Sequence, residues 1–312
     1  MSGFKMRKRL VLAAIETTYG TDASPSAAAN AILTRTVQVT PLAGEDIERN
    51  LLRSYYGNSQ ALAGEKHVEL TMEVELAGSG EAGTAPGWGV LLRACGFAET
   101  VESGVDVAYN PITDGEESIS CWIHRDGVLH KFTGGRGSVR FDLGVNNIPY
   151  MTFTFLGLLG TISNTSMPTT ADYSPWQVPV PVTQANTSAL TLHGASVSFS
   201  QLTLDMAVEA VKHQVVGSDS SIKIVDRAPS GTAVIEEPQL STLNLYQKAR
   251  DAVTGALALT HGKTAGNIIE ISAPKVGTAS PTEQDRNGVQ MLSVPLTINP
   301  DTGNDELVIT VK

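Results

Sequence analysis

Residues 67–76 alternate without a break between apolar and polar side chains. Successive side chains of a β-strand point to opposite faces, so this pattern predicts a strand with one face in a core and the other against solvent or a partner. The polar face carries three carboxylates, Glu69, Glu73 and Glu75. Strand signals dominate from Ile32 onward, and charged residues make up only 17% of the chain, below the roughly 25% typical of soluble domains. A mainly β protein with partner-covered surfaces is therefore expected.

Turn signals between the apolar runs predict how the strands connect. Asp126-Gly127 separates two apolar runs and predicts a two-residue hairpin. Asn146-Asn147 predicts a further turn, and the phase of the alternation changes near Gln201, which indicates a β-bulge.

Two short helices are expected between the strands. In residues 86–97, apolar side chains recur at helical spacing before Gly96, a residue type that commonly ends a helix. The second helix is expected to begin at a Ser241 cap and to stop at Gly255.

Composition divides the chain into four segments: a basic N-terminal arm over residues 1–30, a first β-domain over 31–162, a Pro-rich linker over 163–188 and a second β-domain over 189–312. Proline at this density favours an extended connection. The apolar run after Arg9 is too short for a signal peptide, and no segment approaches the roughly 20 apolar residues of a membrane helix. We therefore expect synthesis in a cytoplasm and no membrane contact.

The second half of the chain repeats the first in outline. An offset of 160, the difference between 211 and 51, places residues 211–217 opposite residues 51–57. The same offset places Val234 opposite Val74, and each of these strands precedes one helix and further strands. The matching order predicts a duplication, with two tandem β-units in one chain.

No residue pattern typical of catalysis or metal binding emerges. Cys121, His124 and His130 could be drawn as a metal site, but strand parity puts the first two on opposite faces. We expect the histidines to be exposed and the cysteines to be reduced core residues. The Gly-rich residues 133–137 lack the Lys-Ser/Thr pair and helix of a phosphate loop. The sequence thus predicts no enzyme, no cofactor and no metal.

Six patches of the chain resemble tail tube subunits of long-tailed, siphovirus-type bacteriophages. They are the segments RKRLVL at residues 7–12, ETTYGTD at 16–22, GWGVLLRACGF at 87–97, DGVLHKFTG at 126–134, IPYMTFTF at 148–155 and GNDELVI at 303–309. The patches span nearly the whole chain, and none contains a catalytic motif. They support a structural family and identify no reaction.

The resemblance implies a tube-type β-sandwich or half-barrel with one short packed helix, and the duplication gives two such units in tandem. In that family six such units close a ring, and stacked rings form the conduit through which the genome is ejected. The resemblance also implies a virion protein made in the bacterial host cytoplasm, with tape measure, tail terminator and distal tail proteins as further partners. DNA is expected to pass without specific binding, in keeping with the net charge of -10.

Two units per chain predict a homotrimeric, pseudo-hexameric ring, with a homohexamer as the alternative. Corresponding loops in the two halves are the candidate contacts between rings: Gly57, Asn58, Ser59, Gln60, Gly217, Ser218 and Asp219. The N-terminal arm is a further candidate. Glu69, Glu73 and Glu75 are candidate lumen residues, although the polar face of their strand could equally point outward.

Two other functions remain open on the sequence. A capsid-decoration protein would also be β-rich and acidic. A carbohydrate-binding or adhesive module would need an aromatic platform, but aromatic residues are only 5% of the chain, and Trp88, Trp122 and Trp176 fall in a helix, a strand and the linker. The absence of any extra module favours a non-contractile tail.

Overall fold

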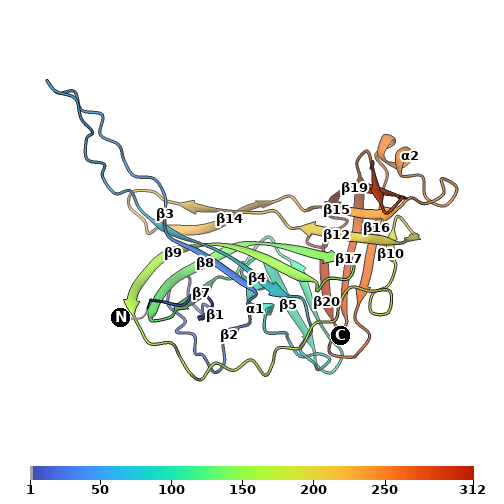
Figure 1. Ribbon diagram of the computed structural model, residues 1–312, viewed down its shortest axis with the longest axis horizontal. Helices are drawn as coiled ribbons and strands as arrows, with labels where there is room; N and C mark the ends of the chain where they lie inside the picture. The colour runs from blue at the N-terminus through green and yellow to red at the C-terminus, as the bar shows by residue number, and fades with distance from the viewer. Residues whose placement is uncertain (1–2) are drawn as a thin grey trace.

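The computed structural model describes residues 3–312 and is mainly antiparallel β-structure with two short helices (Figure 1). The predicted fold class is thereby confirmed. The first half contains β1 (Arg9–Ile15), β2 (Ala31–Ile32), β3 (Thr36–Ala43), β4 (His67–Glu75), α1 (Gly89–Arg93), β5 (Phe97–Glu102), β6 (Asp106–Pro111), β7 (Ile119–Arg125), β8 (Val128–Gly144) and β9 (Tyr150–Asn164).

The second half carries the remaining elements. They are β10 (Leu190–Leu192), β11 (Ala195–Val197), β12 (Phe199–Asp205), β13 (Val208–His213), β14 (Ser221–Arg227), β15 (Ser230–Glu236), α2 (Leu245–Arg250), β16 (Thr254–His261), β17 (Ile269–Thr278), β18 (Thr282–Arg286), β19 (Val289–Asn299) and β20 (Val308–Val311). Between the halves, residues 165–189 contain no helix or strand and run along the lower side of the molecule in Figure 1.

One antiparallel sheet passes through both halves. The sheet has 18 strands among residues 3–312, and eight of them form one continuous run, here called the long sheet, in the order β3-β4-β9-β8-β12-β15-β19-β18. The first four strands come from the first half and the last four from the second. The pairing of β8 with β12 joins them, with Leu202 opposite Leu143 and Leu204 opposite Phe141. The predicted bulge lies in β12, between Phe199 and Gln201.

A second layer of strands covers one face of the long sheet. β8 also pairs along its first half with β7, and β7 pairs with β1, while β17 pairs with β16 and β20. Side chains from both halves pack into one apolar cluster between the layers. Trp88 lies fully inside it, and its indole N–H donates to the Ala77 carbonyl at 2.7 Å. A buried Trp N–H needs such a partner, so this bond fixes the entry to α1.

Local turn predictions are largely confirmed. Asp126 and Gly127 connect β7 to β8 with φ values of 40° and 109°, and Asn146 turns the chain between β8 and β9 at φ 59°. The helix expected in residues 86–97 is the short α1, and Gly96 follows it at φ 78°. The positive φ explains why glycine stands there.

The second helix differs from its prediction. Asn244, not Ser241, is the N-cap, and its side-chain oxygen accepts from the Gln247 backbone N–H at 2.9 Å. The helix ends at Arg250, and Gly255 belongs to β16. Both Ser and Asn are good N-caps, so the sequence alone allowed the helix to begin at either residue. Only Leu245 of α2 is buried.

The N-terminal segment is built into the fold rather than free. β1 pairs along its whole length with β7, and Val11 and Leu12 are buried. The Glu16 carboxylate, itself buried, accepts hydrogen bonds from Ser118 Oγ at 2.7 Å and Ser120 Oγ at 2.8 Å. Backbone N–H groups of Gly20 and Gly134 donate to it as well. These donors offset the cost of burying a carboxylate.

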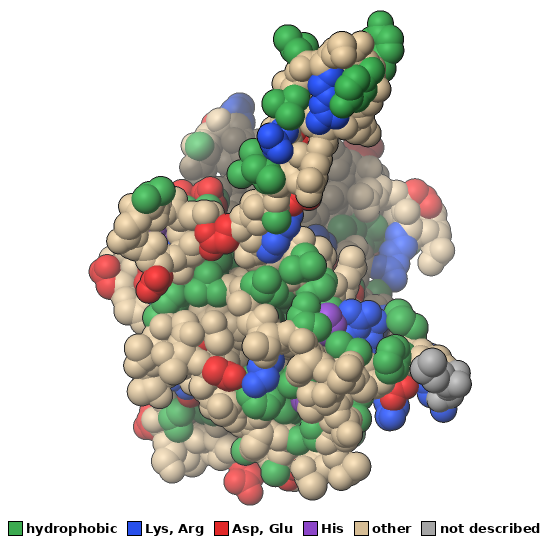
Figure 2. Space-filling model, turned by 90° about the vertical axis from the view of Figure 1, so that its left-hand side faces the viewer, with side chains coloured by type: hydrophobic (Ala, Val, Ile, Leu, Met, Phe, Trp, Pro, Cys, Tyr) green, Lys and Arg blue, Asp and Glu red, His purple; other side chains and the backbone are tan. Residues whose placement is uncertain are grey.

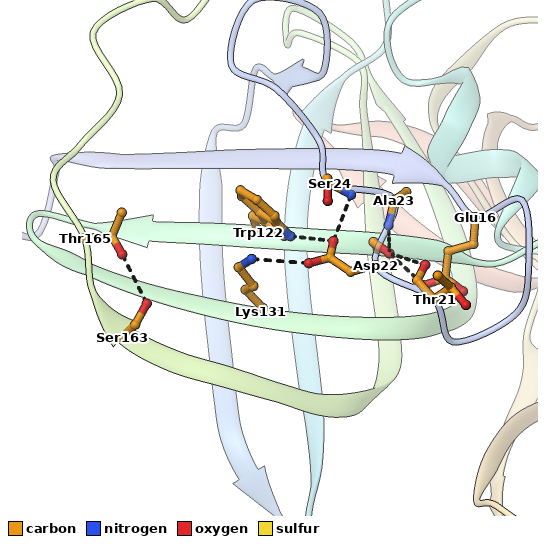
Figure 3. A network of polar contacts seen from close by, with 10 residues as sticks. Glu16, Thr21, Asp22, Ala23, Ser24, Trp122, Lys131, Ser163 and Thr165 are labelled. Atoms are coloured by element: carbon orange, nitrogen blue, oxygen red, sulfur yellow. Dashed lines mark hydrogen bonds and ion pairs between the residues drawn. The ribbon is translucent and has the colours of Figure 1, made fainter.

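A second polar anchor follows a few residues later (Figure 3). Asp22 accepts from the Trp122 indole N–H at 2.9 Å and from Lys131 Nζ at 3.2 Å, and the Lys131 ammonium lies 3.5 Å from the Trp122 ring centroid. The two anchors attach residues 16–22 to β7 and β8. The expected N-terminal arm therefore contains an integral strand and two polar attachments.

Candidate assembly interface

Residues 44–66 project from the body as a long arm between β3 and β4 (Figure 1). Ile47 and Leu62 form an isolated bridge near its base, with N–O distances of 2.7 and 2.9 Å. Beyond that bridge the apolar side chains have no cover: Leu51, Leu52, Tyr55 and Tyr56 are all exposed. Figure 2 shows hydrophobic and basic side chains together at this end of the molecule.

The exposed apolar tip of the arm favours contact with another molecule. Leu52 and Tyr56 are as exposed as in an extended peptide, at 102% and 105%. Burying a large apolar side chain yields about 2 kcal/mol, and exposed apolar patches commonly mark protein contacts. The predicted contact residues Gly57, Asn58 and Gln60 are exposed on this arm, and Ser59 is half-buried.

The counterpart in the second half is the β13–β14 hairpin. It pairs only with itself among residues 3–312 and packs across β8 and β9. Its tip carries the predicted residues Gly217, Ser218 and Asp219, all exposed, beside the exposed Val215 and Val216.

The base of the arm and the hairpin meet. Lys212 Nζ of β13 lies 3.1 Å from the Glu65 carboxylate and donates to the Glu65 carbonyl at 3.2 Å. Hydrogen bonds from Ser220 and Lys212 hold the pKa of the Glu65 carboxyl below its usual value. The two loops predicted to act together therefore emerge from adjoining positions.

The long sheet is open at both ends. Within residues 3–312, β3 pairs with β4 alone and β18 with β19 alone. β3 contains Pro41, which has no N–H to donate and is typical of edge strands. The Arg9 guanidinium donates to the Val37 carbonyl of β3. All five residues of β18 are exposed. Open edges are the parts of a sheet that can accept a further strand.

The three predicted lumen carboxylates share the face of β4 that points away from the core. Glu69 is exposed, and Glu73 and Glu75 are half-buried. Glu73 lies 3.8 Å from Arg35, and Glu69 lines a shallow hollow beside Val208 of β13. Their common face follows from the alternation, while its direction in an assembly stays a prediction.

The histidine prediction was wrong in one respect. Cys121 lies in the main core and His124 on the other face of β7, as parity required, but His124 and His130 are buried, not exposed. β1 lies beside β7 in the sheet, with Leu10 opposite His124, and residues 4–6 line a hollow together with His130. Burial lowers the pKa of both imidazoles and raises that of the Cys121 thiol.

Chemistry-bearing clusters are scarce in the part of the chain that the structure describes. Residues 3–312 contain no group of three or more His, Cys, Asp or Glu side chains placed to hold a metal ion. No helix formed by these residues is long and apolar enough to cross a bilayer. The surface features suited to contact with another molecule are the arm, the hairpin tip and the two sheet edges.

A β-rich subunit with open sheet edges and an exposed apolar arm is a protein suited to assembly. The family model described as "Phage tail tube protein" matches residues 6–308, nearly the whole chain. The chain therefore belongs to the phage tail tube protein family and is a structural component of a phage tail. A search of curated proteins finds no match.

Proposed function

We propose that this chain self-assembles into rings that stack into the tail tube, the conduit for genome ejection. Membership of the tail tube family supports a structural, non-catalytic role. The subunits are made in the bacterial host cytoplasm and end in the virion. By family resemblance, tape measure, tail terminator and distal tail proteins contact the finished tube.

One observation carries the proposal for a ring of three chains. The β8–β12 pairing unites two four-stranded sheets of the same strand order within a single chain. A ring of six such sheets would need three chains. Closure is the physical reason for a ring, because only a closed sheet leaves no lateral edge exposed.

The arm supplies the proposed contact between stacked rings. Its exposed Leu52 and Tyr56 and the hairpin tip with Gly217 project beyond the sheet. DNA passes through the lumen without specific binding, because the acidic chain repels phosphates. Glu69, Glu73 and Glu75 face this lumen in the proposal.

Electron microscopy of the purified chain tests the proposal. We expect stacked rings with a central channel and a ring mass equal to three chains. Six full-length chains per ring would refute the trimer, and a chain that stays monomeric at all concentrations would refute assembly into a tube.

A tip variant isolates the stacking step. Leu52→Ser with Tyr56→Ser should form rings that do not stack, because the apolar contact between rings is lost. Val101→Ser, which removes an exposed apolar side chain from β5, is the matched control and should stack normally. Tubes of normal length from the tip variant would contradict the role given to the arm.

A further inference from the structure

The contact between the two halves of the chain is a strand pairing with a defined register. β8 and β12 are antiparallel, and five residue pairs stand opposite each other. On the core face, the apolar pairs are Leu202–Leu143 and Leu204–Phe141. On the other face, Thr203 Oγ1 donates to Asp142 Oδ1 at 3.0 Å.

The two halves can be superposed strand by strand from their pairings. Glu75 opposite Tyr150 is the last pair of β4 and β9, and Glu236 opposite Met291 is the last pair of β15 and β19. Four alternating buried positions then coincide: residues 151, 153, 155 and 157 of β9 with residues 292, 294, 296 and 298 of β19.

The same superposition aligns the outer strands. Glu73 falls on Val234. Thr36 of β3 therefore falls on Gln201 of β12, since Thr36 pairs with Glu73 and Gln201 pairs with Val234. The alternation of core-facing residues agrees with this alignment, because the core-facing Val37 falls on the buried Leu202. The offset of 160 expected from sequence is therefore off by one in this strand: Val74 is fully buried, but Val234 faces the other side.

At the far end of the second half, β18 falls on the end of β8. Asp142 pairs with Tyr150 and Gln284 with Met291, so Gln284 takes the place of Asp142. Thr282–Arg286 thus corresponds to residues 140–144, the part of β8 that pairs with β12. In the second half this position has no strand on its outer side within the described residues, and every residue of it is exposed.

We propose that β18 of one copy pairs with β3 of the next copy, antiparallel and in the register of the β8–β12 junction. The inference rests on the proposed ring and names the contact that joins its chains. The geometry of the internal junction gives the expected partners: Thr36–Arg286, Val37–Asp285, Gln38–Gln284, Val39–Glu283 and Thr40–Thr282.

The charges near the two edges support β18 of a second copy as the strand that pairs with β3. β18 offers Glu283 and Asp285 on one face, the face that corresponds to Phe141 and Leu143. At the β3 end, the Arg9 guanidinium lies on the Val37 carbonyl, opposite the place assigned to Asp285. β3 itself carries no charged side chain, so the attraction is between Arg9 of β1 and Asp285 and not between residues directly opposite each other; like charges across neighbouring strands destabilise a sheet. Two β18 strands facing each other would instead bring acidic side chains together.

A disulfide across the proposed junction tests the register. Directly opposite residues in antiparallel strands have Cα atoms about 4.5–5.5 Å apart, within the range of a disulfide. Gln38→Cys with Gln284→Cys should cross-link neighbouring chains in assembled rings under mild oxidation. The native Cys95 and Cys121 are buried and will not compete.

Gln38→Cys with Asp285→Cys is the matched control, because a one-residue shift puts the two thiols on opposite faces. We expect at least tenfold less cross-linking from it. On a non-reducing gel the ladder from the first pair should end at three chains. Rings that form without the Gln38–Gln284 cross-link, or that cross-link equally in both variants, overturn the register. Cross-linking of Gln284→Cys alone would show β18 pairing with itself and would also overturn it.

The outcome separates this inference from the proposed tube. Failure of the unsubstituted chain to form rings refutes the proposed function. If only the cysteine variants fail to assemble, hydrogen exchange on the unsubstituted ring decides: amides in residues 36–40 and 282–286 should exchange more slowly in the ring than in the monomer. Unchanged amide exchange in both segments refutes the pairing of β18 with β3 but does not contradict the proposed tube.

Discussion

The end of β8 and the whole of β18 hold corresponding places in the two halves, but their surroundings differ. Phe141 and Leu143 of β8 are fully buried against β12, while the corresponding Glu283 and Asp285 of β18 are exposed. The first junction forms once, as the chain folds, so it can use apolar side chains. The second position must stay soluble until a partner arrives, and charged side chains on an edge strand prevent indiscriminate pairing.

The largest effect expected from this contrast is on the stability of the isolated chain. Phe141→Ala should lower the free energy of unfolding by about 3–5 kcal/mol, because it leaves a cavity in the core. Glu283→Ala, at the corresponding position, should change it by less than about 0.5 kcal/mol, because that side chain is exposed. Urea denaturation of the monomer measures both, and similar losses at the two positions would remove the contrast.

A buried ion pair lies beside the contact between the halves. Arg227 of β14 pairs with the buried Glu306 and donates at 2.7 Å to Asn304 Oδ1, all within the second half, while its hydrogen bond to the Ile112 carbonyl crosses to the first half. Arg227→Ala should cost about 3 kcal/mol, since it leaves a carboxylate buried without its partner. Arg250→Ala, whose ion pair with Asp251 is exposed, is the control and should cost under about 1 kcal/mol. Thermal unfolding compares them, and an unchanged melting temperature for Arg227→Ala would contradict a stabilising role for the buried pair.

The smallest effect concerns the polar face of the junction. Thr203→Val removes the hydrogen bond to Asp142 and should lower stability by about 1 kcal/mol. Gln284→Ala, at the position that corresponds to Asp142, should leave the monomer unchanged and should weaken ring formation only slightly. Denaturation of the monomer and the concentration dependence of ring assembly measure the two, and a stability loss for Gln284→Ala would show that β18 is not free in the monomer.

Strands whose side chains alternate were predictable from the sequence. The Asp126-Gly127 hairpin, the bulge near Gln201 and the strand over residues 67–76 all match the structure. β18 was missed, because its sequence TEQDR has no apolar residue to alternate. β1 was assigned to an N-terminal arm, because residues 1–30 carry too few apolar residues for a core of their own.

Only part of the candidate interface could be predicted from the sequence. The loops after Gly57 and Gly217 were predicted from their corresponding positions, and both are exposed. The apolar tip at Leu52 and Tyr56 is marked in the sequence by large apolar residues within a loop, a pattern that indicates contact with another molecule. Neither the β3 edge nor the β18 edge could be found, because an edge is defined by the absence of a neighbour.

By itself the sequence determined the parity of the strands, the main turns and the mainly β class, because those features depend on neighbours a few residues apart. Tertiary structure decided the rest. It buried His124 and His130, and it paired β8 with β12 across some sixty residues of chain. Pairings between distant segments depend on which strand edges meet once all the apolar faces are packed together, and no local pattern in the chain encodes that.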